Sequence, residues 1–200
     1  MNNGHVSDHV SSSADKYPIY EGYAKNLESL IRTILLSKRI PFHIVESRAK
    51  AVQSFRDKIS RRGKKYVNPL EDITDLCGCR IITYYQDDCS AVADLIKSEF
   101  EVIEEELSHQ PSHLESDRFG YISSHYIIKM REDRAHLIEW SPYSSLIAEV
   151  QVRTVIQHAW SAVSHAIQYK EETQVPSLLQ RRLYRIAGLF ELDTRKNRVF

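Results

Sequence analysis

Segments typical of strands alternate with segments typical of helices along most of this 200-residue chain, and that order limits the folds open to it. Runs rich in β-branched and aromatic residues predict strands over residues 79–85, 101–107, 123–130, 136–140 and 146–152. Apolar residues at three- and four-residue spacing predict helices over residues 20–38, 89–100, 154–170 and 177–192. This interleaving predicts an α/β or α+β fold, in which one mixed β-sheet is flanked by helices around a single core.

The first residues differ in composition from the rest. Residues 1–17 are polar and rich in serine, and they lack the apolar content that a segment needs to become ordered. We therefore expect a flexible N-terminal arm over residues 1–17 and a single domain over residues 18–200.

Charge and cysteine content exclude several classes of protein. Lysine plus arginine number 27 and aspartate plus glutamate also number 27, so the net charge points to no charged partner and any such signal must be local. The three cysteines are an odd number, which argues against a secreted disulfide framework and for a reducing compartment. No run of about 18 apolar residues occurs, so we expect no membrane span and a cytoplasmic location.

Residues 48–65 form the most basic segment of the chain. No glycine-rich phosphate loop is present, so side chains would have to hold any phosphate. A helix that starts near Lys50 would place Ser54 and Lys58 one turn apart on one face, close to Arg48, and these groups could converge on a polyphosphate. A solvated basic helix face is the alternative interpretation, because such charge runs are common on surfaces.

Two carboxylates stand where a strand does not usually carry one. Asp75 comes just before a predicted strand, and Glu149 lies inside the strand predicted over 146–152, on the face opposite the apolar side chains. Two carboxylates at neighbouring strand ends could bind Mg²⁺ together with substrate phosphates. The alternative is two ordinary salt bridges, Asp75 with Arg80 and Glu149 with Arg153.

An aromatic residue and two histidines are further candidates. Tyr121 follows a glycine-supported turn that would expose its ring, and such a tyrosine can stack on a nucleobase; a tyrosine packed in the core is the alternative. His158 and His165 lie seven residues apart and thus on one face of a predicted helix. Since no third ligand stands at a suitable spacing, we favour hydrogen bonding or phosphate contact over a metal site.

Four motifs follow one another in the chain. They are Ser47-Arg48-Ala49-Lys50 with Ser54 and Lys58, Asp75-Leu76-Cys77-Gly78-Cys79-Arg80-Ile81, Gly120-Tyr121-x-Ser123-x-His125-Tyr126, and Glu149-Val150-Gln151-Val152-Arg153-Thr154 followed by Gln157-His158-Ala159-Trp160 and Tyr169-Lys170. In order and spacing, they resemble the synthetase domain of the RelA/SpoT-type alarmone synthetases, and the small single-domain alarmone synthetases in particular.

The resemblance implies a nucleotidyltransferase-like fold and a GTP/GDP 3′-pyrophosphokinase, which transfers pyrophosphate from ATP to the 3′-hydroxyl of GDP or GTP to make (p)ppGpp. By motif position, Asp75 and Glu149 would be the catalytic residues: Asp75 would bind Mg²⁺, and Glu149 would bind the Mg²⁺ or activate the attacking hydroxyl. The ATP donor would be held by Arg48, Lys50, Ser54, Lys58 and Arg80. The acceptor would be bound by Tyr121, which stacks on its base, and by His125, Gln151, Arg153 and His158.

Departures from the family pattern fall on the acceptor side. Ile122 stands where many members carry a basic or glutamine side chain, Asp117 replaces a common lysine, and Ser164 replaces a common glutamate. The acceptor therefore stays open between GDP or GTP, an adenine nucleotide and the 3′ end of tRNA, as in toxin-like relatives. A catalytically silent nucleotide-binding module is a third interpretation, against which the intact Asp75 and Glu149 speak.

The same resemblance bears on further activities and partners. No His-Asp dipeptide occurs in the chain, so we expect synthesis without hydrolysis. The sequence leaves open whether a second copy of the chain or an antitoxin is a partner.

Overall fold

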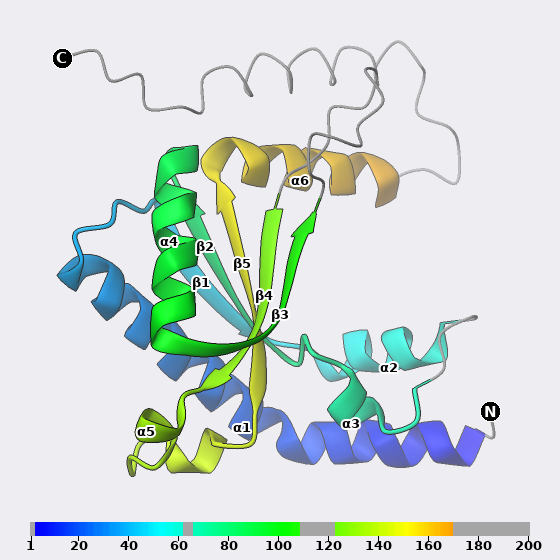
Figure 1. The fold of residues 1–200 in the computed structure, drawn as a ribbon. Coiled ribbons are helices and arrows are strands. Elements are labelled where there is room, and N and C mark those ends of the chain that lie inside the picture. The colour runs from blue at the N-terminus through cyan, green and yellow to red at the C-terminus, as the bar shows by residue number, and fades with distance from the viewer. Residues whose placement is uncertain (1–2, 62–65, 109–122, 170–200) are drawn as a thin grey trace, which may run out of the picture.

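A mixed sheet lies at the centre of the protein. The computed structural model describes residues 3–61, 66–108 and 123–169, and within them five strands form one sheet in the order β1-β2-β5-β4-β3 (Figure 1). The strands are β1 Ile44–Ala49, β2 Cys77–Thr83, β3 Phe100–Ser108, β4 Ser123–Met130 and β5 Ile147–Thr154. β2 and β5 pair in parallel, and the other neighbouring strands pair antiparallel. The predicted mixed α+β architecture is confirmed.

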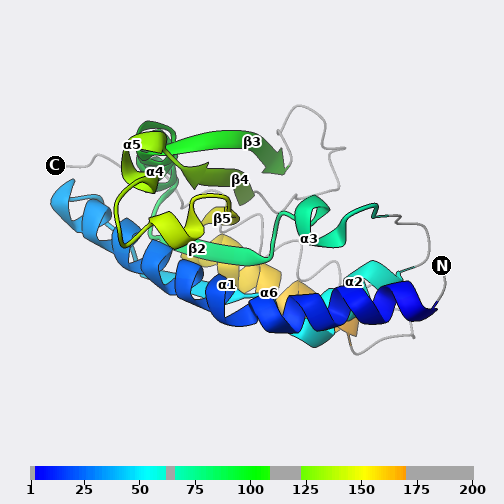
Figure 2. The ribbon, with the colours of Figure 1, turned by 90° about the horizontal axis from the view of Figure 1, so that it is seen from below.

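Helices lie against this sheet and at its ends. In the described residues they are α1 Asn3–Ser37, α2 Val52–Ser60, α3 Pro69–Asp72, α4 Gln86–Glu99, α5 Glu132–Ala135 and α6 Val155–Tyr169, with a short 3-10 helix η2 Ser141–Tyr143 before β5. α1 packs on β1 and β2, and α4 packs on β2, β3 and β5. In Figure 1, α6 lies across one end of the sheet, while α2 and α3 lie near the other. Seen from below in Figure 2, α1 extends past the sheet towards α2 and α3, both of which it contacts.

The two faces of the sheet differ in polarity because side chains alternate along each strand. On β5, Val150 and Val152 are buried in the core that α1 and α4 share. Glu149 and Gln151 alternate with them on the opposite face, beside Arg80 of the parallel strand β2. This opposite, polar face holds the candidate site.

The N-terminal residues do not form the expected flexible arm. α1 begins at Asn3, so residues 3–17 are helical and continue into the helix that the sequence predicts over 20–38. Val6 and Val10 pack against the core, and Ser13 is only 2% exposed. The prediction is wrong because tertiary packing of one helix face outweighs a polar average composition.

Two further elements differ from prediction. Residues 136–140, predicted as a strand, form turns after α5, with Trp140 buried and Ile138 91% exposed. β1 at Ile44–Ala49 was not predicted, because its polar second half hides the strand pattern. The helix predicted over 177–192 lies outside the described residues. None of the helices within the described part of the chain is both long and apolar enough to cross a membrane.

Candidate active site

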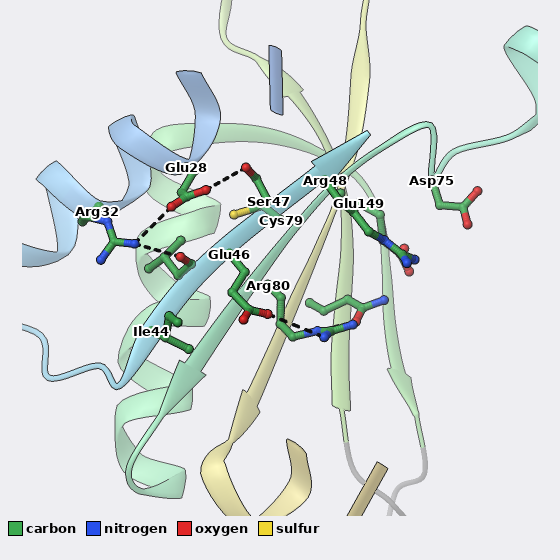
Figure 3. A pocket seen from close by; sticks show the side chains of 13 residues that line it. Glu28, Arg32, Ile44, Glu46, Ser47, Arg48, Asp75, Cys79, Arg80 and Glu149 are labelled. Carbon is green, nitrogen blue, oxygen red and sulfur yellow. Dashed lines mark hydrogen bonds and ion pairs between the residues drawn. The ribbon is translucent and has the colours of Figure 1, made fainter. Parts of the chain in front are cut away.

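A pocket of about 470 Å³ opens on the polar face of the sheet. β2 and β5 run parallel with Gly78 opposite Glu149, so the segment that leads into β2 brings Asp75 to the same end of the sheet as Glu149. Both carboxylates line the pocket, and the side chains around them come from α1, β1, β2 and β5 (Figure 3). The predicted site residues in the lining are Arg48, Asp75, Arg80, Glu149 and Gln151.

Asp75 has both of its carboxylate oxygens bound by lysines. Lys50 Nζ lies 2.6 Å from Oδ2, and Lys58 Nζ lies 2.9 Å from Oδ1. Burial raises the pKa of Asp75, but the hydrogen bonds and charges of the two lysines outweigh burial and hold that pKa below its ordinary value. Arg80, the partner that the salt-bridge interpretation assigns to Asp75, instead lies 3.8 Å from Glu46.

Glu149 is held by a histidine from the neighbouring strand. Its Oε1 lies 2.8 Å from Nδ1 of His125, and since an ionised carboxylate only accepts hydrogen bonds, Nδ1 carries the hydrogen. Burial raises the pKa of Glu149, but the hydrogen bond and charge of His125 outweigh burial, so the pKa lies below its ordinary value. The charge of Asp75 acts in the opposite direction and raises it. The two carboxylates are thus close enough to influence each other's ionisation.

A second polar group lies further along β5, towards α6. The side-chain oxygen of Gln151 accepts hydrogen bonds from Nε of Arg80, at 3.4 Å, and from the guanidinium of Arg153. Arg153 is only 4% exposed. Burial lowers the pKa of His158 on α6, and the charges of Arg80 and Arg153 lower it further. The α6 end of the site therefore carries positive charge.

The remaining predicted residues lie at different places. Arg48 lies on β1 and points into the pocket (Figure 3). The helix that the sequence predicts from Lys50 begins at Val52, because β1 continues to Ala49. Ser54 lies on α2 and is exposed, outside the pocket lining. Tyr121 lies outside the described residues.

Three charged residues of the pocket lining were missed by sequence reasoning. Arg32 on α1 donates hydrogen bonds to Oε1 of Glu28 at 3.1 Å and to the carbonyl of Val45 at 2.8 Å. Oε2 of Glu28 accepts a hydrogen bond from Ser47 at 2.7 Å (Figure 3). The i,i+4 spacing of Glu28 and Arg32 could have marked this pair. Glu46 could not be found, because β1 was not predicted.

The two carboxylates of the pocket have the chemistry that a divalent cation needs. Among the described residues, no group of three or more His, Cys, Asp or Glu side chains is arranged to hold a metal ion. Asp75 and Glu149 nevertheless fit Mg²⁺, which usually takes one or two protein carboxylates and completes its coordination with water and phosphate oxygens.

The pocket brings two kinds of charged group together. Its arginines, with the two lysines at Asp75, are suited to phosphate groups. Glu149 is suited to accept a proton from a hydroxyl group. The arrangement can therefore bind a polyphosphate next to a group that activates a nucleophile.

Comparisons with known proteins show a family and relatives to which this chain is similar. A family model described as a region found in RelA / SpoT proteins matches residues 47–174. The GTP pyrophosphokinase YjbM of Bacillus subtilis (strain 168) is 27% identical over 147 residues, which cover 72% of this chain and 65% of that protein. The GTP pyrophosphokinase YwaC of the same organism is 28% identical over 142 residues, which cover 70% of this chain and 64% of that protein. The match thus spans slightly less than two thirds of each relative.

A solved structure extends the similarity to the fold. The crystal structure of the small alarmone synthetase 1 from Bacillus subtilis, bound to its product pppGpp, superposes with a TM-score of 0.66 at 25% identity. The alignment covers 87% of this chain and 89% of that chain.

Proposed function

The chain belongs to the RelA/SpoT family, and we propose that it is an enzyme that transfers pyrophosphate from ATP to the 3′-hydroxyl of GDP or GTP, which yields (p)ppGpp. One observation carries the proposal: Asp75 and Glu149 line the same pocket as Arg48, while Lys50 and Lys58 bind Asp75. The two relatives named GTP pyrophosphokinase, and the synthetase crystallised with pppGpp, support it.

The proposed reaction is an in-line displacement at phosphorus. The 3′-oxygen of the acceptor bonds to the β-phosphorus of ATP, the bond from that phosphorus to the oxygen bridging the α-phosphate breaks, and AMP leaves. Such transfers depend mainly on positioning and on neutralising charge. Arg48, Lys50 and Lys58 neutralise the phosphates of the donor. Asp75 and Glu149 would hold Mg²⁺, which would supply further neutralisation of the phosphate charge.

Glu149 accepts the proton that leaves the acceptor hydroxyl. Its pKa lies below the ordinary value, so the carboxylate is ionised near neutral pH, as a base must be. His125 hydrogen-bonds Oε1 and Gln151 also hydrogen-bonds the carboxylate, so both side chains hold Glu149 in position.

The acceptor lies at the α6 end of the site in this proposal. Arg80 and Arg153 place positive charge there, beside His158, whose pKa they lower, and Gln151 holds the two arginines in position through its side-chain oxygen. Tyr121 stacks on the acceptor base in the proposed complex.

The test follows the transferred phosphates. The purified protein is incubated with Mg²⁺, ATP labelled at the γ-phosphate and, in separate reactions, GDP, GTP, unlabelled ATP and deacylated tRNA. We expect label in a guanine nucleotide product. If label appears only in an adenine nucleotide product or in tRNA, that molecule is the acceptor and not GDP or GTP. If no acceptor takes up label, the protein is a silent nucleotide-binding module and not this enzyme.

Variants of two carboxylates separate the role of Glu149 from a general effect of charge. Glu149→Gln should abolish transfer while ATP binding stays nearly unchanged, because the amide cannot accept the proton. Glu46→Gln is the matched control, since Glu46 also lines the pocket but is half-exposed and pairs only weakly with Arg80. Substantial turnover by Glu149→Gln would refute the role of Glu149.

A further inference from the structure

The lysine contacts of Asp75 use both of its oxygens. Two ammonium groups, 2.6 Å and 2.9 Å away, face one carboxylate, and the Asp75 side chain is only 19% exposed. Lys50 and Lys58 are also mostly buried, at 10% and 27% side-chain exposure. Two positive charges against one negative charge make the surroundings of Asp75 positive. The net positive charge of this group of three side chains therefore disfavours a free divalent cation at Asp75.

Glu149 differs from Asp75 in this respect. Its hydrogen-bonding partners are the ring nitrogen of His125, on Oε1, and the side chain of Gln151, rather than two ammonium groups. Glu149 is therefore accessible to a cation, whereas the two lysines block cation binding at Asp75. Within the described part of the chain no third acidic, histidine or cysteine ligand completes a metal cluster.

We propose that Lys50 and Lys58 keep Asp75 closed to a divalent cation until the phosphates of the donor nucleotide draw both lysines away. This inference rests on the proposed function, because it takes ATP as the donor and Asp75 as a cation ligand. The proposal sets the order in which the two ligands bind. The protein binds the divalent cation together with the nucleotide or after it, and not before it.

Lysine chemistry makes such an exchange feasible. An ammonium group on a flexible four-carbon stem can move from one anion to another without movement of the backbone. The phosphate groups of ATP carry several negative charges, whereas Asp75 carries one, so the lysines gain attraction when they move to the phosphates. Lys58 is placed for this movement, because it lies in the last turn of α2 and keeps part of its side chain in solvent.

The proposal predicts opposite effects of one substitution on two ligands. Lys58→Met keeps the aliphatic stem but removes one of the two ammonium groups, which lowers the repulsion at Asp75. The affinity for a cation without nucleotide should rise, whereas the affinity for ATP should fall. A purely structural role for Lys58 would lower both.

The experiment titrates the nucleotide-free protein with manganese chloride and measures free Mn²⁺ by electron paramagnetic resonance, with Mn²⁺ as the probe for Mg²⁺. We expect weak Mn²⁺ binding by the wild type and an increase in affinity of at least about tenfold in Lys58→Met. Arg56→Gln is the matched control, because it removes one positive charge from an exposed position of α2 two residues away. It should leave Mn²⁺ affinity within about twofold of the wild type.

A double variant shows whether Asp75 is responsible for the Mn²⁺ affinity gained in Lys58→Met. Lys58→Met combined with Asp75→Asn should lose the gained Mn²⁺ affinity, because the amide is a poor ligand for the cation. Persistence of the gain in the double variant, an equal gain in Arg56→Gln, or tight Mn²⁺ binding by the wild type would each overturn the proposal. Circular dichroism confirms that the variants compared are folded.

The outcome is separable from that of the proposed function. Mn²⁺ binding is measured without nucleotide and does not depend on turnover. If no acceptor yields labelled product but Lys58→Met gains Mn²⁺ affinity, the proposed enzymatic activity is rejected. The proposal that the lysines block cation binding at Asp75 then still stands. If labelled product forms but Lys58→Met gains no Mn²⁺ affinity, the proposed activity stands and the proposal about the lysines is rejected.

Discussion

At the scale of single residues, the hydrogen bond between His125 and Glu149 fixes one oxygen of the carboxylate. The two side chains come from neighbouring antiparallel strands, with His125 opposite Gln151 and Ile127 opposite Glu149. The diagonal contact, 2.8 Å between Nδ1 and Oε1, is therefore set by the register of β4 and β5 and not by a loop. His125 is a positioning residue in the proposed reaction.

Replacing His125 tests this positioning role. His125→Ala removes the hydrogen bond, so kcat should fall by about 10- to 100-fold while KM for ATP changes little. His125→Asn should recover most of the loss, because the asparagine amide can donate a hydrogen from nearly the position of Nδ1. Steady-state kinetics on both variants provide the measurement. An equal loss in both would speak against positioning by this hydrogen bond.

The stability that Asp75 contributes should depend on pH. Its pKa in the folded protein lies below the ordinary value of 3.8, so the contribution is fully present above the unfolded-state pKa and is lost as the pH falls through the folded-state pKa. Asp75→Asn should lower the free energy of unfolding by about 2 kcal/mol near neutral pH. The difference between variant and wild type should shrink as the pH falls below about 4. Urea denaturation of variant and wild type near neutral pH and below about pH 4 measures this difference in the free energy of unfolding. A difference that does not depend on pH would contradict the expectation.

At the scale of elements, α1 shows how packing overrides composition. Its first turns are polar, yet the side chains of Val6 and Val10 reach the core and Ser13 is buried. Further along, Arg32 donates to the carbonyl of Val45 and so caps part of the outer edge of β1. The first turns of α1 thus extend the core, which a flexible arm could not do, and its later turns protect an edge strand.

Pro18 inside α1 offers a direct test of this helix. A proline within a helix removes one backbone hydrogen bond and clashes with the preceding turn. Pro18→Ala should therefore raise the free energy of unfolding by about 1 to 3 kcal/mol. Asp15→Ala, an exposed neighbour, should change it by no more than about 0.7 kcal/mol. Chemical denaturation compares the two, and an unchanged Pro18→Ala variant would indicate that residues 3–17 are not helical in solution.

Elements with a strong local pattern could be predicted, and those set by distant partners could not. The strand over 123–130 has the bounds that the sequence predicts, and α4 and α6 lie within a few residues of their predicted positions. The apolar residues over 136–140 resemble a strand, but they form turns next to η2 because no neighbouring strand pairs with them. β1 has a weak pattern of its own and is a strand because it pairs with β2.

At the scale of the whole molecule, the site exists only in the folded chain. Arg48, Asp75 and Glu149 come from widely separated segments, and strand pairing brings them to one pocket. A ligand that bridges these segments binds the native state and not the unfolded chain. Such a ligand therefore stabilises the whole fold.

Thermal unfolding should report this linkage. MgATP at one hundred times its dissociation constant should raise the free energy of unfolding by about 2.7 kcal/mol and increase Tm accordingly. Lys50→Met should lose most of this increase at the same ATP concentration, because it removes a cation that holds the phosphates. Differential scanning calorimetry compares the two proteins. An increase of equal size in Lys50→Met would exclude Lys50 from the ATP site.

The mixed sheet with its helices, the strand over 123–130 and the charged residues of the four motifs could be read from the sequence alone, because periodicity and motif spacing depend on residues close in the chain. The tertiary structure decided the partners of those residues. Asp75 pairs with Lys50 and Lys58 and not with Arg80, and Glu149 is held by His125. These contacts depend on sheet order and register, which arise from long-range packing and leave no local pattern in the chain.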